Sequence, residues 1–306
     1  MFQQILTWCA AGASAALALL TIGGLLAPFD PRFEMINHFR PFWLVGAAFV
    51  LVLALVLRKP LLVAAALVLV AALGGLTLLP LRDTAPKVVD GARSLRIVSL
   101  NLSPQNRRLD EVARYLIASN ADVIVLQEVV CREYDSLFAA LADSYPHVFR
   151  ASESCFGQAI LSKHPIVATG RRDFRWRRPS WLWAEIAVGS KTIRITGVHL
   201  SHPTRPFDQA VNMNEFIAYS RGIDLPHAIA GDFNLTPYAS LLAKLSREAG
   251  VLRHGTFRAS WPSRLPLPVV LIDHVYTNAH FASAGFQVGP FLGSDHYPVI
   301  ADLVLR

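Results

Sequence analysis

Three long apolar runs dominate the pattern of the first 82 residues. Ile5–Ala27 carries no charge, Phe42–Leu57 is shorter, and Leu61–Leu81 is long again. A membrane-spanning helix needs about 20 apolar residues. The pattern therefore predicts a membrane domain over residues 1–82 with three transmembrane helices. A cleaved signal peptide is the alternative for the first run, but that run lacks a basic leader and two further apolar runs follow it.

Basic residues in the short loops predict the orientation of these helices. Arg58 and Lys59 lie in the short turn after the second run, whereas residues 28–40 mix Arg32 and Arg40 with acidic residues. Lys and Arg favour the cytoplasmic side of a membrane. Because they are denser in the turn, we place that turn in the cytoplasm. We therefore expect an inner- or plasma-membrane protein with a cytoplasmic N-terminus and an extracytoplasmic C-terminal domain.

Beyond the apolar runs, short β-branched stretches alternate with stretches of helical spacing. Residues 83–94 show no periodicity and read as a linker, which leaves residues 95–306 for one sizeable domain. Strands are expected at 95–100, 123–126, 158–161, 183–188, 192–198, 228–230, 269–276 and 299–305, and helices at 108–119, 135–141, 208–219 and 240–248. This alternation predicts a layered domain of the α/β class.

Polar side chains follow several of the predicted strands. The buried run at 228–230 leads through Gly231 to Asp232 and Asn234, which share one face because they are two residues apart. A turn that closes the strand is the alternative for this stretch alone. Other strand ends offer the same residue types: Asn101, Glu128, His199, Asp273, Asp295 and His296. If these ends share one edge of a sheet sandwich, the side chains converge on one cleft.

The residue types at these strand ends narrow the chemistry. Carboxylate and amide oxygens suit Mg²⁺ or Mn²⁺, whereas a zinc site relies on His and Cys. The sequence contains no HExxH, no GxxxxGK[ST] phosphate loop and no GxSxG nucleophile motif. These observations favour metal-assisted attack of water on a phosphate ester, with an Asp or His managing the proton.

The ordered set of motifs resembles the endonuclease/exonuclease/phosphatase superfamily. The motifs are Asn101, Gln127-Glu128, Gly157–Ile166, His199, Gly231–Asn234, Asp273-His274 and Ser294–Pro298. The resemblance covers residues 95–306 and is most specific at the GDFN and SDHYP stretches. It implies a four-layered α/β sandwich, in which two mixed β-sheets are flanked by helices, and a metal-dependent phosphodiesterase or phosphatase.

The resemblance also implies a role for each motif residue. Glu128 is expected to be the principal ligand of Mg²⁺ or Mn²⁺, with Asn101 and Asp295 beside it. Asp232 would orient or deprotonate the attacking water, and Asn234 would hold that water or a phosphate oxygen. His296 would face the scissile phosphate and His199 the leaving group. Asp273 would keep His296 protonated, since a nearby carboxylate raises the pKa of an imidazole.

An arginine-rich stretch is the main clue to the substrate. Residues 171–178 contain five arginines, and Trp181 and Trp183 follow them. Arginine matches phosphate geometry and tryptophan favours the bilayer interface. Arg175, Arg177, Arg178 and Trp181 are therefore candidate substrate-binding residues. The alternative is a solvated basic hairpin beside a strand whose Trp183 belongs to the core.

Two of the three cysteines fall in the predicted exported domain. Cys131 and Cys155 either form a disulfide in an oxidising compartment or remain unpaired, and both readings fit their positions. Cys9 lies within the first apolar run.

Three functions remain compatible with these features. The favoured one is a membrane-held hydrolase that contacts membrane lipids and cleaves a lipid phosphate or pyrophosphate at the outer face. The alternative is an exported magnesium-dependent nuclease, because residues 95–306 carry 22 Lys and Arg against 18 Asp and Glu. A catalytically dead binding protein is disfavoured by the full motif set. No protein partner follows from the sequence.

Overall fold

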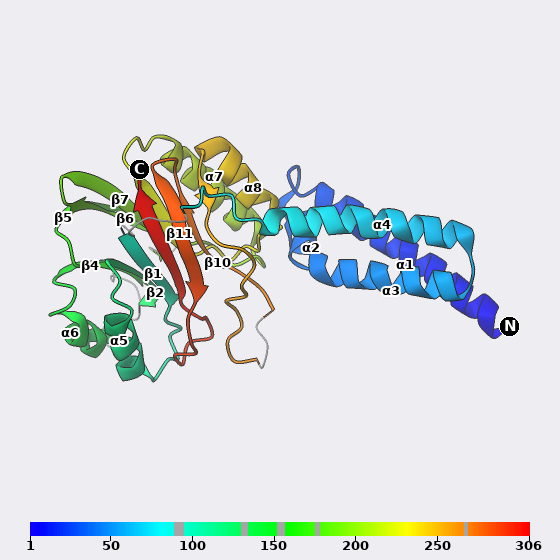
Figure 1. The fold of residues 1–306 in the computed structure, drawn as a ribbon, viewed down its shortest axis with the longest axis horizontal. Coiled ribbons are helices and arrows are strands. Elements are labelled where there is room, and N and C mark those ends of the chain that lie inside the picture. The colour runs from blue at the N-terminus through cyan, green and yellow to red at the C-terminus, as the bar shows by residue number, and fades with distance from the viewer. Residues whose placement is uncertain (89–94, 130–133, 152–156, 175–177, 266–268) are drawn as a thin grey trace. The chain divides into compact units, whose positions relative to one another are not determined.

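The computed structural model describes residues 1–88, 95–129, 134–151, 157–174, 178–265 and 269–306, with the side chains of residues 174 and 178–180 excepted (Figure 1). The chain divides into two compact units. The helical unit contains Met1–Arg82, Pro203–Ala210 and Leu235–Ala243, and the sandwich unit contains Asp83–His202, Val211–Asn234 and Lys244–Arg306.

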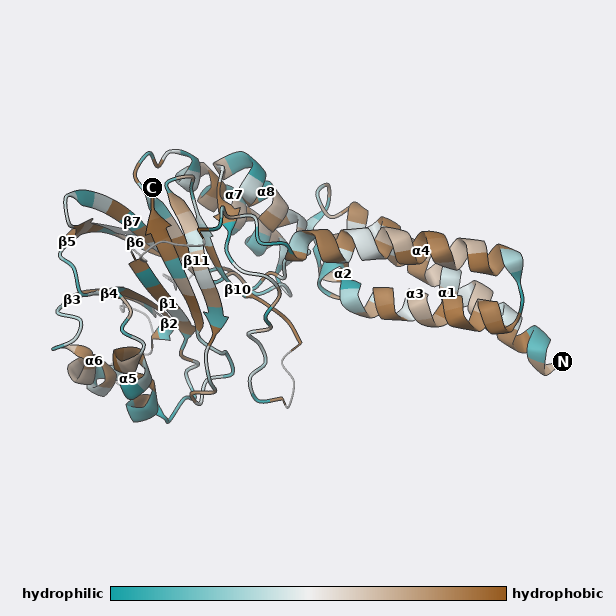
Figure 2. Cartoon of the chain, in the orientation of Figure 1, coloured by the Kyte–Doolittle hydropathy of each residue, from teal (hydrophilic) through white to brown (hydrophobic). Residues whose placement is uncertain are grey.

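Long apolar helices build most of the helical unit. Its elements are α1 (Phe2–Leu25), η1 (Pro31–Phe33), α2 (Glu34–His38), α3 (Arg40–Val56), α4 (Pro60–Leu78) and η2 (Leu79–Leu81). Figure 2 shows hydrophobic residues around α1, α3 and α4 rather than along one stripe. Small residues, among them Ala47 and Ala66, are fully buried where these helices pack together. An apolar surface on all sides is typical of helices surrounded by lipid.

The predicted count of three spans is only partly met. By length and composition, two of the described helices can cross a membrane, Phe2–Leu25 and Pro60–Leu81. A third span results if Pro31–His38 and Arg40–Val56 count as one, but this pair is bent by 59°. The middle apolar run is thus a 17-residue helix, α3, preceded by a bent segment that also holds buried polar residues.

Two six-stranded sheets form the sandwich unit, and the predicted α/β sandwich is confirmed. The first has the order β11-β12-β1-β2-β4-β3 and the second the order β5-β6-β7-β8-β10-β9. The strands of the first sheet are β1 (Leu95–Asn101), β2 (Val123–Val129), β3 (His147–Ala151), β4 (Gly157–Ser162), β11 (Phe281–Val288) and β12 (Val299–Leu305). Those of the second are β5 (Ile166–Phe174), β6 (Arg178–Val188), β7 (Lys191–His199), β8 (His227–Asp232), β9 (Leu252–Arg253) and β10 (Asp273–Thr277).

Alternate residues of both sheets fill the core between them. Ile97 and Val125 from the first sheet and Ile195 and Ala230 from the second are fully buried in one cluster. α5 (Leu109–Ala118) and α6 (Asp135–Leu141) bury a second cluster against the outer face of the first sheet. α7 (Pro206–Arg221) places Phe216 against Trp181 of the second sheet, and α8 (Ser240–Ala249) follows β8.

Part of the predicted linker is attached to the sandwich unit. The backbone N–H groups of Thr84 and Ala85 donate to the carbonyl oxygen of Arg253, and that of Val88 donates to the carbonyl oxygen of Ser283. Residues 83–88 are therefore bonded to the edge strands β9 and β11 of the sandwich unit, and Lys87 forms an isolated parallel bridge with Ser283. The remainder of the predicted linker, 89–94, lies outside the described residues, as do Cys131 and Cys155.

Candidate functional site

The predicted polar residues meet at one edge of the two sheets. β1 and β2 run parallel, as do β7 and β8, so their carboxyl ends reach the same edge. β10 and β12 run antiparallel to their neighbours, so their first residues begin at that edge. Strand direction thus gathers side chains that lie up to about 200 positions apart in the sequence.

Three site residues stand in register across the second sheet. His199 of β7 lies opposite Asp232 of β8, and Asp232 lies opposite Asp273 of β10. Gly231 allows β8 to approach β7 closely, because a Cβ atom there would lie 2.0 Å from the carbonyl oxygen of Val198. Glycine is required at this position by the packing of the strand that presents Asp232.

The first sheet supplies the residues with oxygen ligands. Asn101 ends β1, Glu128 lies near the end of β2, and Asp295 precedes β12. Glu128 has a φ of +54°, a conformation that a non-glycine residue adopts at an energetic cost and that clusters at functional sites. Its carboxylate lies 3.5 Å from His199 Nε2, and both side chains remain about one fifth exposed. This is the accessible side of the site.

A hydrogen bond joins the two sheets at the site. Asn101 Nδ2 donates to Asp232 Oδ2 over 3.1 Å, and Asn101 Oδ1 accepts from the backbone N–H of Ser103 over 3.0 Å. Both residues are buried. The bond fixes the position of Asp232 relative to the predicted metal ligands of the first sheet.

His296 lies between two buried carboxylates. Its Nδ1 is 2.9 Å from Asp273 Oδ2, and its Nε2 is 3.7 Å from Asp232 Oδ2. Burial alone would lower the pKa of His296, but the charges of Asp273 and Asp232 outweigh it and raise the pKa to about 10. His296 is therefore a cation at neutral pH.

The same charges act on the neighbouring carboxyl groups. Burial raises the pKa of Asp232, and the charge of Asp273 adds to this effect while His296 opposes it. Burial disfavours the charged form of Asp295, but the charge of His296 and the hydrogen bonds from Ser103 and Trp261 together outweigh burial and lower the pKa of that carboxyl. Asp295 is thus held as a carboxylate, whereas Asp232 has the greater proton affinity that a base requires.

Asn234 contributes mainly to holding Asp232 in place. Its backbone N–H donates to Asp232 Oδ1 over 2.8 Å, and its φ of +52° lets the chain turn for that bond. Its Nδ2 donates to the carbonyl oxygen of Leu200 over 3.0 Å. The expected contact of Asn234 with water or a phosphate oxygen remains a prediction.

The donor set fits a hard divalent cation. Four carboxylates (Glu128, Asp232, Asp273 and Asp295) face two imidazoles (His199 and His296), so negative charge remains even when both rings are protonated. Oδ1 of Asp273 is also buried without a hydrogen-bond partner. Oxygen ligands and uncompensated negative charge are what Mg²⁺ or Mn²⁺ needs. Asp232, Asp273 and His296 offer ligand atoms within 4.8 Å of one another, but the imidazolium between them fills the role of the cation there.

Several residues that support the site were not predicted. Ser260 Oγ donates to Asp273 Oδ2 over 2.6 Å, Trp261 Nε1 donates to Asp295 Oδ2 over 3.3 Å, and Ser294 Oγ donates to the carbonyl oxygen of Asn101 over 2.6 Å. Ser260 and Trp261 come from a segment without strand or helix periodicity, so no sequence pattern marks them. Ser294 lies within the recognised SDHYP stretch.

The predicted arginine-rich surface is changed by the structure. Residues 171–174 belong to β5, which pairs antiparallel with β6 as the hairpin alternative requires, but Trp183 is only half-buried. Arg171 pairs with Asp173 at 3.3 Å and Arg172 with Glu215 at 3.1 Å. Trp181 is only 3% exposed and packs on Phe216, so its position does not favour the predicted contact with substrate. Arg175 and Arg177 lie outside the described residues, as does the side chain of Arg178.

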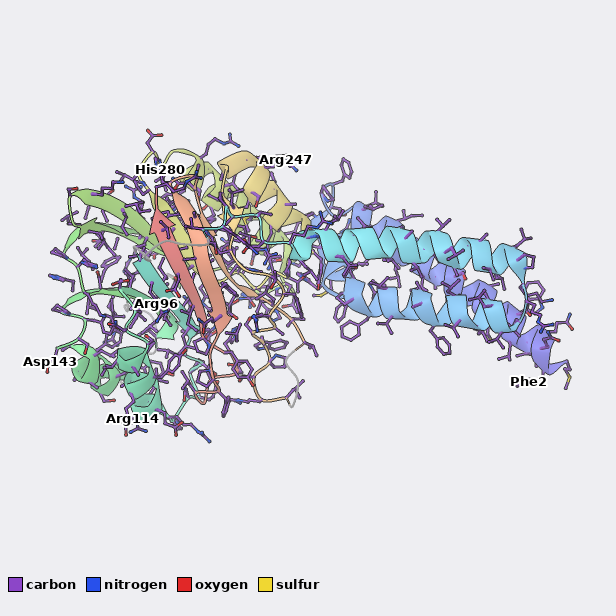
Figure 3. All side chains as sticks on the ribbon, viewed as in Figure 1. Phe2, Arg96, Arg114, Asp143, Arg247 and His280 are labelled. Atoms are coloured by element: carbon purple, nitrogen blue, oxygen red, sulfur yellow. The ribbon has the colours of Figure 1, made fainter. Side chains whose placement is uncertain are left out.

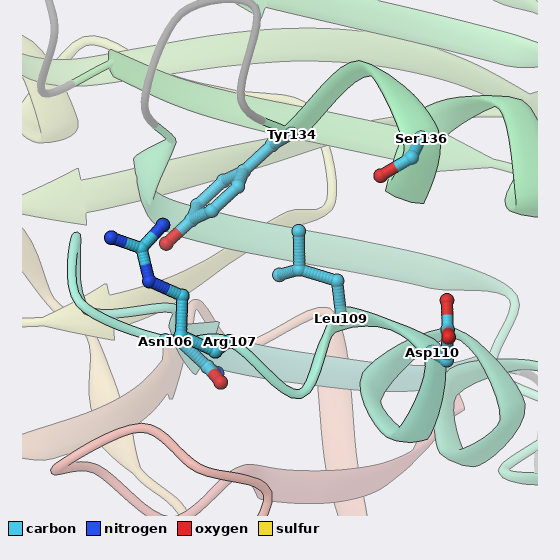
Figure 4. A pocket seen from close by; sticks show the side chains of 6 residues that line it. All are labelled: Asn106, Arg107, Leu109, Asp110, Tyr134 and Ser136. Carbon is cyan, nitrogen blue, oxygen red and sulfur yellow. The ribbon is translucent and has the colours of Figure 1, made fainter.

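A hollow lies beside the segment that leaves β1. It has a volume of about 230 Å³ and is lined by Asn106, Arg107, Leu109, Asp110, Tyr134 and Ser136 (Figure 4). Tyr134 donates its hydroxyl to the carbonyl oxygen of Ser103 over 2.5 Å, and Ser103 also bonds Asn101. None of the predicted site residues lines this hollow. Its wall is linked to the site through Ser103.

The fold and the site together define an α/β sandwich with an acidic, histidine-containing centre at the strand ends. Residues 96–296 match the endonuclease/exonuclease/phosphatase family, and the chain belongs to that family. No curated protein matches the chain in sequence.

Solved structures share the fold at low sequence identity. TDP2 of D. rerio, solved with a single-strand DNA product, is 18% identical with a TM-score of 0.60, and the match covers 69% of this chain and 98% of that chain. An endonuclease/exonuclease/phosphatase from Beutenbergia cavernae is 21% identical with a TM-score of 0.57, over 70% of this chain and 72% of that one. A mannosyl-6-phosphatase of Bacteroides thetaiotaomicron is 16% identical with a TM-score of 0.57, over 69% and 100%.

Proposed function

We propose that the sandwich unit is a phosphoester hydrolase that uses Mg²⁺ or Mn²⁺. The observation that carries this proposal is His296, a buried imidazolium held between Asp273 and Asp232 beside the oxygen donors of Asn101, Glu128 and Asp295. Positive charge next to a carboxylate of raised pKa suits attack by water on an anionic ester. Family membership supports the same class of reaction.

Each residue has a role that follows from its environment. Asp232 accepts a proton from the attacking water, because its pKa is raised and Asn101 and Asn234 fix its orientation. His296 donates an N–H to a phosphate oxygen from Nε2, since Asp273 holds its Nδ1. His199, on the accessible side, faces the leaving group. In these positions, hydrogen-bond donors that are already oriented stabilise the negative charge that develops on the phosphate.

The cation has one place in this scheme. Asn101, Glu128 and Asp295 would hold it, and when bound it neutralises charge on the phosphate oxygens.

The helical unit favours a substrate in the membrane. The segments that follow His199 and Asn234 in the chain, Pro203–Ala210 and Leu235–Ala243, belong to the helical unit. Phe207, in the first of them, is 57% exposed. Long apolar helices in the same chain suit a lipid phosphate or lipid pyrophosphate better than a soluble polymer. In this account the sandwich unit lies outside the cytoplasm.

Hydrolysis of nucleic acid is the second candidate. The surplus of basic side chains favours binding of a polyanion, and one structural relative was solved with a DNA product. The described arginines of the hairpin, Arg171 and Arg172, are paired with carboxylates, which reduces the charge available to DNA.

Parallel assays distinguish the candidates. Full-length protein with Mg²⁺ would be tested on polyprenyl pyrophosphate, sphingomyelin and plasmid DNA, and we expect turnover of a lipid substrate. Asp232→Asn should reduce the rate by about 10²–10⁴-fold, because it removes the proposed base. Cleavage of DNA without lipid turnover would reverse the ranking of the two candidates.

Asp143→Asn is the matched control for that substitution. Asp143 is exposed beyond α6 and is labelled in Figure 3. Asp143→Asn removes the same charge from the same unit as Asp232→Asn does, so the Asp143→Asn protein should turn over substrate at the wild-type rate. Normal turnover by the Asp232→Asn protein would refute the assigned site.

A further inference from the structure

Glu34 is a buried carboxylate in the segment between the first two apolar runs. It is 3% exposed and accepts two hydrogen bonds from Ser240, one from the backbone N–H over 2.6 Å and one from the hydroxyl. Ser240 is the first residue of α8. Asn37 Nδ2 lies 3.4 Å from the same carboxylate. A buried charge is retained only where several donors satisfy it, and here Ser240 supplies two of them.

His38, one helical turn after Glu34, bonds the same region of the chain. Its Nδ1 lies 2.9 Å from Thr236 Oγ1 and 3.4 Å from the Thr236 backbone nitrogen. Because a backbone N–H can only donate, Nδ1 acts as the acceptor. Both side chains are buried, at 8% and 2% exposure. α2 thus holds both ends of the segment from Thr236 to Ser240.

Two glycines allow α2 to lie close to α1. A Cβ atom at Gly24 would approach Asn37 Oδ1 to 2.4 Å, and one at Gly23 would approach Ile36 Cδ1 to 2.8 Å. Neither glycine has a positive φ, so their role is to provide space. α2 is therefore fixed to the end of the first apolar helix, and it has little freedom to follow the segment that it bonds.

The bonded segment continues directly from the catalytic site. Asp232 and Asn234 are followed by Leu235 and Thr236, which are buried, and Ser240 comes six residues after Asn234. Asn234 orients Asp232 through its backbone N–H. A displacement at Thr236 is therefore transmitted through two residues to the turn that holds the proposed base. Misplacement by about 1 Å can reduce a rate by about 10²-fold.

We propose that Glu34 and His38 are positioning residues for the Asp232–Asn234 turn, so that the helical unit takes part in setting the geometry of catalysis and is more than an anchor. The inference rests on the proposed hydrolase function for its kinetic readout. Neither residue touches the substrate or the cation. They act through Thr236 and Ser240.

The test uses full-length protein in detergent and a small soluble substrate, bis(p-nitrophenyl) phosphate, so that access of a lipid to the site plays no part. For Glu34→Ala and His38→Ala we expect kcat to fall about tenfold with KM nearly unchanged. Mn²⁺ affinity, measured by the resonance of free Mn²⁺, should weaken about tenfold, because Asp232 accepts a hydrogen bond from the proposed cation ligand Asn101. Glu34→Gln keeps an oxygen that accepts from the Ser240 backbone, so its loss should be smaller.

Asp30→Ala is the matched control. Asp30 lies in the same loop and accepts from the Arg32 backbone N–H over 2.9 Å, so it tests loss of a carboxylate without loss of the bonds to α8. Ser240→Ala and Thr236→Val remove the hydroxyl part of these contacts from the other side, while the backbone N–H bonds remain, and they cover the case in which Glu34→Ala fails to fold. Glu34→Ala and Ser240→Ala should be strongly non-additive in kcat, as expected for two ends of one contact.

The outcomes separate this inference from the proposed function. Lower thermal stability of the variants with unchanged kcat and unchanged Mn²⁺ affinity would overturn the inference and leave the hydrolase intact. If the wild type hydrolyses no phosphoester but Glu34→Ala still weakens its Mn²⁺ affinity, the proposed function is refuted and the inference is supported. Additive effects of Glu34→Ala and Ser240→Ala would also count against it.

Discussion

At the scale of single residues, the site depends on charges that are expensive to bury alone. His296 and Asp273 are 6% and 1% exposed, and a buried ion pair is retained only where both charges are satisfied. Asp273 receives a hydrogen bond from Ser260, and His296 lies near a second carboxylate, Asp232. The pair therefore serves to maintain an imidazolium at neutral pH. Stability alone would be served as well by apolar side chains.

Removal of Asp273 should change the pH dependence of the reaction. The charge of Asp273 raises the pKa of His296, so activity that needs the imidazolium is present below that pKa and lost above it. Asp273→Asn lowers this pKa, and the alkaline limb of the kcat/KM profile should move to lower pH. The measurement is kcat/KM between pH 6 and 10 for wild type and variant. An unmoved alkaline limb would show that His296 does not act as the acid form.

The sequence pointed to the charged residues of the site more clearly than to the residues that form hydrogen bonds with them. Asp232 and Asn234 are recognisable because two polar groups on one face follow a buried strand, and His296 because it belongs to the specific SDHYP stretch. Asp273 was predicted from its place in the ordered set of motifs. Trp181 was expected at a surface because five arginines precede it, whereas its side chain packs into the core beside Phe216. Glu34 and His38 gave no local signal, because their partners are about 200 residues away.

At the scale of elements, β8 is held by buried polar contacts at the end opposite to the site. His227 begins β8, and its Nε2 lies 2.8 Å from Thr196 Oγ1 of β7. Tyr219 of α7 packs edge-on against the ring, and the charge of Arg194 lies near it. Burial, with this charge, lowers the pKa of His227 to about 3. The ring is therefore neutral in the folded protein.

This histidine should make the fold sensitive to acid. In the unfolded chain it takes up a proton near its ordinary pKa of about 6.5, so folding is fully favoured above that value and weakened as the pH falls toward 3. From pH 7.5 to 5 the free energy of unfolding should fall by about 2 kcal/mol through His227. Denaturant unfolding of wild type and His227→Gln at both pH values measures this difference. Equal losses in the two proteins would contradict the assignment.

The sequence predicted only some of the strands, and it did not predict their order in the sheets. Several expected strands agree closely with the observed ones, including residues 299–305 of β12 and the first residues of β1 and β2. β3, β5, β9 and β11 were not expected. The arginines of β5 interrupt the alternation of polar and apolar residues that predicts a strand, and β9 is only two residues long. Sheet order depends on contacts between distant strands, which periodicity does not encode.

At the scale of the whole molecule, the contact of Glu34 with Ser240 constrains the membrane topology. The two residues bond directly, so they lie on the same side of any membrane. Of the apolar helices, only α3 and α4 lie between Glu34 and the sandwich unit along the chain. Because Glu34 and Ser240 are on the same side, either both helices cross a membrane or neither does. If Pro60–Leu81 crosses a membrane, as its length and composition allow, this contact predicts that α3 crosses it as well.

Reporter fusions test this topology. With a cytoplasmic N-terminus, a reporter after Arg306 that is active only outside the cytoplasm should give a signal, whereas one placed after Lys59 should not. The Arg58–Lys59 turn lies between α3 and α4, where the positive-inside rule favours the cytoplasm. A cytoplasmic signal from the fusion after Arg306 would refute export of the sandwich unit.

The most direct test of the central claim is a titration of activity with Mg²⁺. Full-length wild type and Glu128→Gln would be stripped of metal with a chelator, and hydrolysis of bis(p-nitrophenyl) phosphate would be followed as Mg²⁺ is restored. The wild type should be inactive without metal and recover fully, and Glu128→Gln should need more Mg²⁺ and reach a rate lower by at least about 10²-fold. Turnover that persists in excess chelator, or a Glu128→Gln titration equal to that of the wild type, would contradict a metal-dependent site at these strand ends.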